Sequence, residues 1–283
     1  MARILACTDG SIYAPSIYGH AAWAASRLNA AVEVLHMLDR HPGAAREAEL
    51  SGAIGFDASQ DLLRKMVELD EAQGRLAQQR SRAILEDAEW VLRAAGIAEV
   101  TLTLRHGALV EALPEFEKAA DLVVVGKRGE AADFAKGHLG SNLERVLRTS
   151  ICPVLVASRA FKPISRAVIA YDGRAASRKA VEYLARRPLL HGVSVHLLTV
   201  GNAGTDEEGL AEARFRLGEA GLDVHMQILP GRPEDVIARV VAESGADLLV
   251  MGAYGHGVLT RMFLGSVTST LLRECRVPAL VFR

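Results

Sequence analysis

The 283-residue chain has little cysteine, little net charge and no cluster of metal-binding residues. Its three cysteines, Cys7, Cys152 and Cys275, form no CxxC pair and cannot all pair within the chain, which favours a reducing compartment. The formal net charge is -1 without a Lys/Arg block, so nucleic acid is not the expected partner, because phosphate-backbone binding needs a clustered positive field. The nine histidines form no HExxH motif and no His/Cys cluster, so we expect no directly bound metal.

Long apolar runs are also missing. None approaches the roughly 18 residues that a membrane-spanning helix needs, and the opening residues, MARILACTDG, enter a strand-like segment without a signal-type apolar core. We therefore expect a cytoplasmic protein with no membrane partner. Half of the residues are nevertheless hydrophobic, so a sizeable core can form without metal or disulfide support.

Short runs rich in Val, Ile and Leu alternate with helix-like segments along the chain. Mostly continuous apolar runs predict parallel strands buried on both faces, and the alternation predicts right-handed βαβ units in an open, doubly wound α/β sheet. The expected strands are 3–8, 31–38, 100–105, 121–126, 153–158, 166–173, 193–200, 223–229, 247–252 and 278–283. The expected helices include 16–28, 76–95, 141–149, 175–187, 207–220, 233–244 and 266–273.

The ten runs divide into two sets of five that match each other locally, which indicates a tandem duplication. Asp9 in ILACTDGS corresponds to Asp172 in VIAYDGRA. Gly126 in AADLVVVGKRG corresponds to Gly252 in GADLLVMGAYG. The segment LGSNLERVLRTSICPVLV likewise matches LGSVTSTLLRECRVPALV.

These matches predict a first domain over 1–158 and a second over 165–283, joined by a short linker that contains Pro163. The first domain is longer, because 117 residues separate its Asp and Gly markers, against 80 in the second, an excess of 37. The extra length lies near 39–75. A loop of this size is commonly a lid, a binding loop or an extra helix, and a tolerated surface insertion is the other interpretation.

The segment MGAYGHG follows a buried strand of the second domain and leads to Gly265-Ser266. Open α/β sheets bind ligands at this carboxyl edge, and glycines permit close approach of the backbone to a ligand. Gly265 opens a helix that Ser266 can cap, and helix amino termini favour phosphate. Ser266 and Thr268 offer hydroxyl donors, while Asp172 on the same edge can reach a ribose hydroxyl or a metal-bound phosphate. A tight turn with an ordinary cap is the alternative. No GxxxxGK[ST] motif and no GxGxxG after the first strand occurs.

The duplicated DG segments, MGAYGHG and LGSVTSTLLRECRVPALV resemble the universal stress protein family in its tandem two-domain form. The glycine spacing is similar to the motif of the ATP-binding branch of that family, and the resemblance covers nearly the whole chain apart from the insertion. It implies two domains, each a five-stranded parallel sheet with helices on both faces. It also implies that the two fifth strands pair, here within one chain as an intramolecular pseudo-dimer, and a further homodimer stays open.

The resemblance further implies binding of ATP, or of ADP or AMP, with Mg²⁺ or Mn²⁺ on the phosphates. In the second domain the implied adenine and ribose residues are Ala170, Tyr171, Asp172 and Val200. Those lining the nucleotide are Met251, Gly252, Tyr254, Gly255 and His256, and those holding the phosphates are Gly265, Ser266, Val267 and Thr268. The corresponding first-domain residues are Thr8, Asp9, Met37, Gly126, Arg128, Gly129, Gly140, Ser141 and Asn142.

The first domain departs from this pattern. Ten residues rather than nine separate Gly129 from Gly140, so its loop must follow another path. Ser141 to Glu144 reads as a capping box, S-x-x-E, whose carboxylate would compete with phosphate. The first loop is the more basic one, however, which would attract phosphate. We therefore expect the second domain to hold the tighter site.

Three functions remain to be compared. The one we favour is a nucleotide-binding sensor or regulator of the stress response. An ATP hydrolase or phosphotransferase is the alternative, although no general base is securely placed opposite the phosphates. An adaptor protein with vestigial sites is the third. The sequence does not identify a protein partner.

Overall fold

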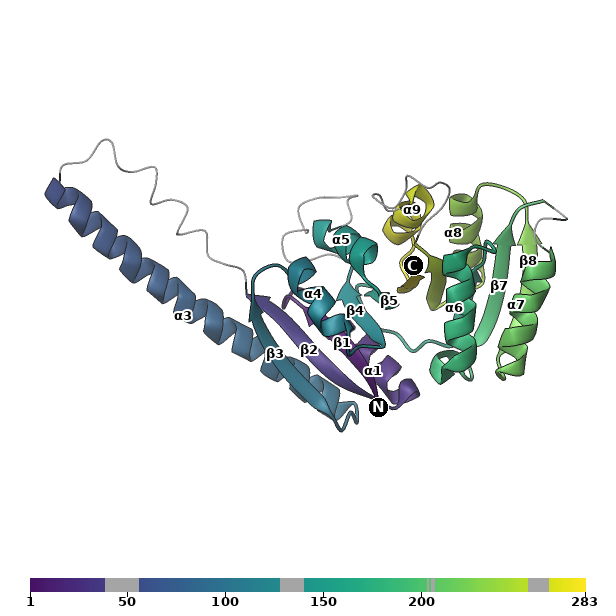
Figure 1. The fold of residues 1–283 in the computed structure, drawn as a ribbon, viewed down its shortest axis with the longest axis horizontal. Coiled ribbons are helices and arrows are strands. Elements are labelled where there is room, and N and C mark those ends of the chain that lie inside the picture. The colour runs from purple at the N-terminus through teal and green to yellow at the C-terminus, as the bar shows by residue number, and fades with distance from the viewer. Residues whose placement is uncertain (39–55, 128–139, 203, 205–206, 254–264) are drawn as a thin grey trace.

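The computed structural model describes residues 1–38, 56–127, 140–202, 204, 207–253 and 265–283. Ten strands form one continuous sheet in the order β3-β2-β1-β4-β5-β10-β9-β6-β7-β8 (Figure 1). The strands are β1 Ala2–Thr8, β2 Ala30–Leu38, β3 Val100–His106, β4 Leu122–Gly126, β5 Val154–Ala157, β6 Arg166–Ala170, β7 Ser194–Val200, β8 Asp223–Leu229, β9 Leu248–Gly252 and β10 Ala279–Phe282. Each predicted strand is therefore present.

Helices cover both faces of the sheet. The helices are α1 Ala14–Leu28, α3 Phe56–Ala94, α4 Leu109–Glu117, α5 Ser141–Thr149, α6 Ala175–Arg186, α7 Glu207–Glu219, α8 Pro233–Glu243 and α9 Ser266–Glu274, with a short 3-10 turn, η2, at Pro188–Leu190. One apolar core joins α1, α3, α6 and α7 to one face, and a second joins α4, α5, α8 and α9 to the other. The predicted doubly wound α/β fold is confirmed.

The two sets of five strands meet at one antiparallel pair. Within each set all neighbouring strands are parallel, whereas β10 runs antiparallel to β5, with Leu280 opposite Leu155. The fifth strands of the two halves thus pair within one chain, as expected for an intramolecular pseudo-dimer. Because the direction reverses there, the carboxyl ends of the two strand sets lie at opposite edges of the sheet.

Side-chain contacts fix the linker to the first half and connect the two halves. The linker after β5 packs on α1, where the Ser16 hydroxyl donates to the Ser158 carbonyl at 2.7 Å and the rings of His20 and Phe161 meet edge to face at 5.0 Å. Arg187, the C-cap of α6, forms an ion pair at 2.6 Å with Asp121, which precedes β4. The halves are therefore held by side-chain contacts as well as by the sheet.

Two helices differ from the sequence prediction: one was missed, and one is longer than expected. The helix α4 was not predicted, because it has only nine residues, follows Gly107 and contains Pro114. The helix α3 has 39 residues and begins at Phe56 rather than Leu76, so much of the predicted insertion is helical. Its structural counterpart α7 has 13 residues. The remaining insertion, 39–55, lies outside the described residues.

The capping-box interpretation was wrong by one residue. Gly140 is the N-cap of α5 and Ser141 is the first helical residue, so Glu144 lies one position later than a capping box requires. The same holds in the second half, where Gly265 rather than Ser266 is the N-cap of α9. In both helices the cap is a glycine with extended backbone, and it has no side chain to satisfy the first N–H groups.

Candidate functional site

The DG sequence after the first strand of each half forms the same turn. The Asp172 carboxylate accepts the N–H of Arg174 at 3.1 Å, and Gly173 between them has a φ of 72°. In the first half the Asp9 carboxylate accepts the N–H of Ser11 at 2.9 Å across Gly10, whose φ is 71°. Each glycine is needed for the left-handed conformation. Each aspartate is therefore positioned by its own backbone at the carboxyl edge of the sheet.

In the second half this turn connects to the end of β9. The Ser177 hydroxyl, in the first turn of α6, lies 2.7 Å from the Asp172 carboxylate. A Cβ at Gly252 would lie 2.9 Å from the Cβ of Ala176. Gly252 is therefore explained by close packing of β9 on α6, and this packing brings the ends of β6 and β9 together. Ser177 was missed in the sequence, since its counterpart in the first half is an alanine, Ala14.

Thr268 fixes the first turn of α9 to the same strand end. Its side chain is buried, and its hydroxyl donates to the carbonyl of Ala253 at 2.9 Å, with the carbonyl of Gly252 at 3.3 Å. The hydroxyl is therefore committed to the main chain and is not the free phosphate donor that the sequence suggested. Its role is to hold the helix terminus against β9.

The amino terminus of α9 lies at this edge of the sheet, and its first N–H groups have no acceptor within the helix. The first helical bond runs from the Ser269 N–H to the Gly265 carbonyl at 2.9 Å. The N–H groups of Ser266, Val267 and Thr268 precede it and therefore have no acceptor within the helix. The first turn of α9 contains no acidic residue, and Ser266 is exposed. Such a terminus attracts anions through its N–H groups and its dipole.

The residues expected around adenine and ribose lie along the ends of β6 and β7. Ala170 is the last residue of β6 and pairs with Met251 of β9, while half-buried Val200 ends β7. Tyr171 is buried in the core, and its N–H donates to the Leu198 carbonyl at 2.8 Å. Its backbone rather than its ring is thus positioned at the edge. Tyr254, Gly255 and His256 lie outside the described residues.

The corresponding edge of the first half is partly filled by α3. Thr8 is buried, and its hydroxyl pairs with that of Tyr18 at 3.2 Å. His36, at the end of β2, contacts the Thr8 carbonyl at 2.9 Å and the Ser81 hydroxyl of α3 at 3.1 Å. A side chain at Gly10 would collide with Ile84 of α3. The long helix therefore packs directly on the DG turn of this half.

The other first-half residues are only partly described. Met37 is half-buried on β2 and Gly126 ends β4, while Gly140 caps α5 and Asn142 is exposed on its first turn. Ser141 is the first residue of α5. Arg128 and Gly129 lie outside the described residues. The first turn of α5 contains Glu144, which weakens its attraction for anions.

Lys127 makes a contact between the halves that the sequence did not indicate. It follows Gly126 at the end of β4, and its ammonium group donates to the carbonyl of Cys275 at 2.7 Å. Cys275 is the C-cap of α9. A cation at this end is favourable for the helix dipole. Lys127, a basic residue of the first half, therefore stabilises a helix of the second half.

The thiols have the properties of packing residues. Burial raises the pKa of Cys7 far above its ordinary value, and burial followed by the negative charge of Glu117 raises that of Cys152 to about 11. Burial also raises the pKa of Cys275. Protonated thiols are poor nucleophiles and poor metal ligands. Within the described residues, no group of three or more His, Cys, Asp or Glu side chains is arranged to hold a metal ion, and no helix could span a membrane.

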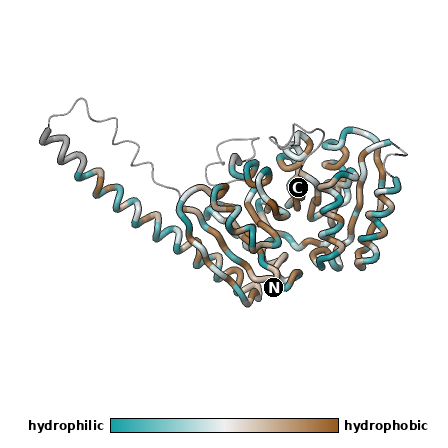
Figure 2. Tube along the Cα trace, viewed as in Figure 1, coloured by the Kyte–Doolittle hydropathy of each residue, from teal (hydrophilic) through white to brown (hydrophobic). Residues whose placement is uncertain are grey.

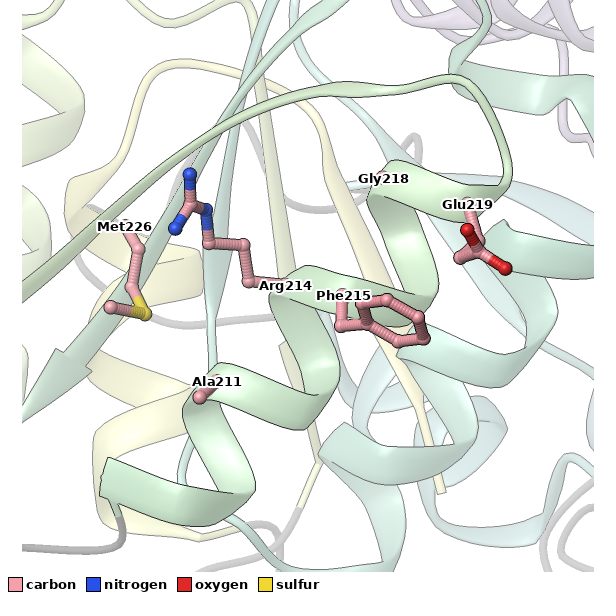
Figure 3. Close-up of a pocket in the computed structure, with 6 residues that line it drawn as sticks. All are labelled: Ala211, Arg214, Phe215, Gly218, Glu219 and Met226. Atoms are coloured by element: carbon pink, nitrogen blue, oxygen red, sulfur yellow. The ribbon is translucent and has the colours of Figure 1, made fainter.

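A surface pocket lies elsewhere, at the outer edge of the second half. It has a volume of about 460 Å³ and is lined from α7 and β8 by Ala211, Arg214, Phe215, Gly218, Glu219 and Met226 (Figure 3). It includes none of the residues expected to bind nucleotide. The candidate site is instead defined by the strand ends of β6 and β9 and by the amino terminus of α9.

The fold defines a class of tandem α/β proteins in which two similar halves pair through their fifth strands. The model of the universal stress protein family matches residues 1–158 and 201–283. The universal stress protein Slr1230 of Synechocystis is 37% identical over 287 residues, which cover 100% of both chains. The universal stress protein Rv2005c of Mycobacterium tuberculosis is 30% identical over 196 residues, covering 62% of this chain and 65% of that protein.

A solved structure agrees with this assignment at the level of the fold. The crystal structure of a universal stress protein from Archaeoglobus fulgidus has a TM-score of 0.70 and 24% identity, and covers 99% of this chain and 98% of that chain. The chain belongs to the universal stress protein family.

Proposed function

We propose that the protein binds ATP, or ADP or AMP, mainly in its second half and acts as a sensor or regulator of the stress response. The observation that carries this proposal is the amino terminus of α9, where three N–H groups lack helical acceptors, next to the Asp172 turn. Phosphates suit the helix terminus, and a ribose hydroxyl suits the carboxylate. The glycine spacing, similar to that of the ATP-binding branch of the family, supports an adenine nucleotide.

A divalent cation fits this arrangement as a companion of the phosphates. Mg²⁺ and similar hard cations prefer oxygen ligands, and Mg²⁺ usually keeps several waters while it bridges phosphate oxygens. The side chain of Asp172 is half exposed and lies on the same edge. The ion would therefore be held by phosphate oxygens and water, with that carboxylate nearby, and would neutralise phosphate charge.

The second half is the tighter site in this proposal. The first turn of α9 has no acidic residue, whereas that of α5 has Glu144. The DG turn of the first half is packed against Ile84, and its strand ends are linked to α3 through His36 and Ser81. The first half is accordingly weaker, different or empty.

Two measurements distinguish a nucleotide-binding protein from an enzyme that hydrolyses the nucleotide. Mass analysis of nucleotide released from the purified protein, followed by titration with ATP and Mg²⁺, should find about one tight site per chain. No bound nucleotide and no saturable binding would favour an adaptor with vestigial sites and reject the proposal. A steady-state phosphate-release assay should give no turnover above the Asp172→Ala control, and turnover that this variant abolishes would favour a hydrolase.

We also propose that the protein works in the cytoplasm, which fractionation would test.

A further inference from the structure

The outer part of α3 carries an apolar stripe that its own domain does not cover. The helix contacts α1, β2 and β3, but its first turns extend well away from the sheet (Figure 1). Among the described residues, eight large hydrophobic residues are exposed, and four of them lie on this helix: Val67, Leu69, Leu76 and Trp90. Figure 2 shows hydrophobic and hydrophilic residues alternating along the projecting part.

Two of these four residues, Leu69 and Leu76, fit a heptad repeat. Leu69 and Leu76 are seven residues apart, and Met66 and Gln73 lie three residues before each of them. In the sequence, Leu62 continues the spacing by one further heptad. These positions are the a and d positions of a coiled coil, with leucine at d and Met66 and Gln73 at a. The side chains of Leu69 and Leu76 are 57% and 66% exposed.

The stripe faces away from the domain. Ser81, Leu85, Ala88 and Leu92 are the buried residues of α3. Leu76 lies five residues before Ser81, which places the two about 140° apart around the helix. Trp90, 72% exposed, lies the same five residues beyond Leu85. A second helix can therefore lie along the stripe without displacing the domain.

The charges that flank the stripe match a parallel copy of the same helix. Lys65 falls at position g and Asp70 at position e of the following heptad, five residues later. In a parallel pair, g of one helix meets the next e of the other, so two Lys65–Asp70 pairs form across the interface. An antiparallel pair would bring g against g and e against e. The charges on the outer face pair within the helix, Arg64 with Glu68 and Arg75 with Glu71.

We propose that α3 is a dimerisation arm through which two copies of this chain form a parallel, in-register coiled coil. Met66, Leu69, Gln73 and Leu76 form the seam. Gln73 lies at an a position, where a polar residue favours one alignment of the two helices at a cost in stability. Arg80 occupies the next a position, so the apolar seam is short and the dimer is a weak one. This proposal is independent of nucleotide binding.

Sedimentation of the full chain over a concentration series tests the arm. The wild type should shift from monomer to dimer, and Leu69→Asp or Leu76→Asp should raise the dimer dissociation constant by more than about tenfold. Val67→Asp is the matched control, because Val67 is 49% exposed on the same stretch but lies at position b, outside the seam. It should leave the dissociation constant unchanged. Equal effects of the three variants, or a wild-type monomer at every concentration, would overturn the proposal.

Cross-linking tests the direction of the helices without relying on a destabilising change. Gln73→Cys should form a disulfide-linked dimer on oxidation, because the two a positions face each other in a parallel, in-register pair. Gln78→Cys, at position f on the outer face, is the control and should stay monomeric on a denaturing gel. Equal cross-linking of both variants, or none by Gln73→Cys, would contradict the parallel register.

Discussion

The DG turn has the same geometry in the two halves of the molecule, but its surroundings differ. In the second half, Ser177 contacts the aspartate and β9 packs closely against α6. In the first half, Ile84 of α3 occupies the space beside Gly10. The comparison indicates that duplication preserved the turn as a structural element. The two turns therefore differ in the helices that surround them.

The helices that face the two edges also differ in charge. At α9 the first turn is free of acid, and Lys127 from the first half binds the carbonyl of its C-cap. At α5 the first turn contains Glu144, and the buried Glu117 contacts the Ser150 hydroxyl and the Ile151 N–H at the other end. The absence of acids at the amino end favours an anion on α9, and Lys127 stabilises the carboxyl end of this helix. The asymmetry therefore involves both ends of each helix.

The largest expected effect comes from the two glycine caps. Gly265→Val should weaken nucleotide binding by at least about 100-fold, because a branched side chain blocks the approach of phosphate to the helix terminus. Gly140→Val should change it little. The two glycines have nearly the same conformation, with φ of -55° and -59°. The cost to the fold is thus matched, and isothermal titration with ATP and Mg²⁺ measures the difference. Equal losses from the two variants would reject the asymmetry.

The sequence predicted the fold well because the relevant signal is repeated. Each apolar strand occurs twice, so the alternation and the duplication could be recognised, and α5 begins and ends where expected. The pairing of the fifth strands was expected only from the family resemblance. The helix α4 was missed because Pro114 interrupts a nine-residue segment. Its counterpart α8 was predicted, so alignment of the two halves could have revealed it.

The candidate site was less predictable than the fold. The positions of Asp172, Gly252 and Thr268 near one edge followed from the strand ends, but their roles did not. Whether a buried hydroxyl donates to a ligand or to a carbonyl depends on packing, and the Thr268 contact with Ala253 has no sequence signal. The link from Lys127 to the C-cap of α9 crosses between the halves, so it depends on their relative placement.

Acid should destabilise the protein through His20, which has no ionisable histidine counterpart in the second half, where Tyr183 occupies the matching position. Burial lowers the pKa of His20 from 6.5 to about 4. The unfolded chain therefore binds the proton more readily, and stability present above pH 6.5 is lost as the pH falls from 6.5 toward 4. We expect a loss of about 3 kcal/mol from this residue. Urea unfolding across this range should show a flatter dependence for His20→Phe.

The control for this effect is His191→Phe, since His191 is exposed. It should keep the wild-type slope. A His20→Phe variant with an unchanged slope would show that acid does not destabilise the protein through His20.

A smaller effect is expected at Thr268, whose first-half counterpart is the buried Leu143. Thr268→Val keeps the shape but removes the donor from the carbonyls of Ala253 and Gly252, and should lower the free energy of unfolding by about 1–2 kcal/mol. Thr268→Ser keeps the donor and should cost less. Urea unfolding measures both, together with nucleotide affinity, which should fall as the first turn of α9 loosens. A valine variant as stable as the wild type would mean that these bonds do not hold the helix terminus.

The smallest expected difference is between the two turn glycines. Gly10→Ala and Gly173→Ala both place a side chain at a φ near 70°, which costs each about 1–2 kcal/mol. Gly10→Ala should cost about 1 kcal/mol more, because the new methyl group meets Ile84 and α3 must move. Thermal unfolding measures the cost of each glycine variant. Comparing Gly10→Ala/Ile84→Ala with Ile84→Ala alone then isolates the cost of the contact between the new methyl group and Ile84. Relief of the extra cost in the Ile84→Ala background would confirm that α3 presses on the first turn. Equal costs at the two glycines would show that α3 does not cause the difference between the two halves.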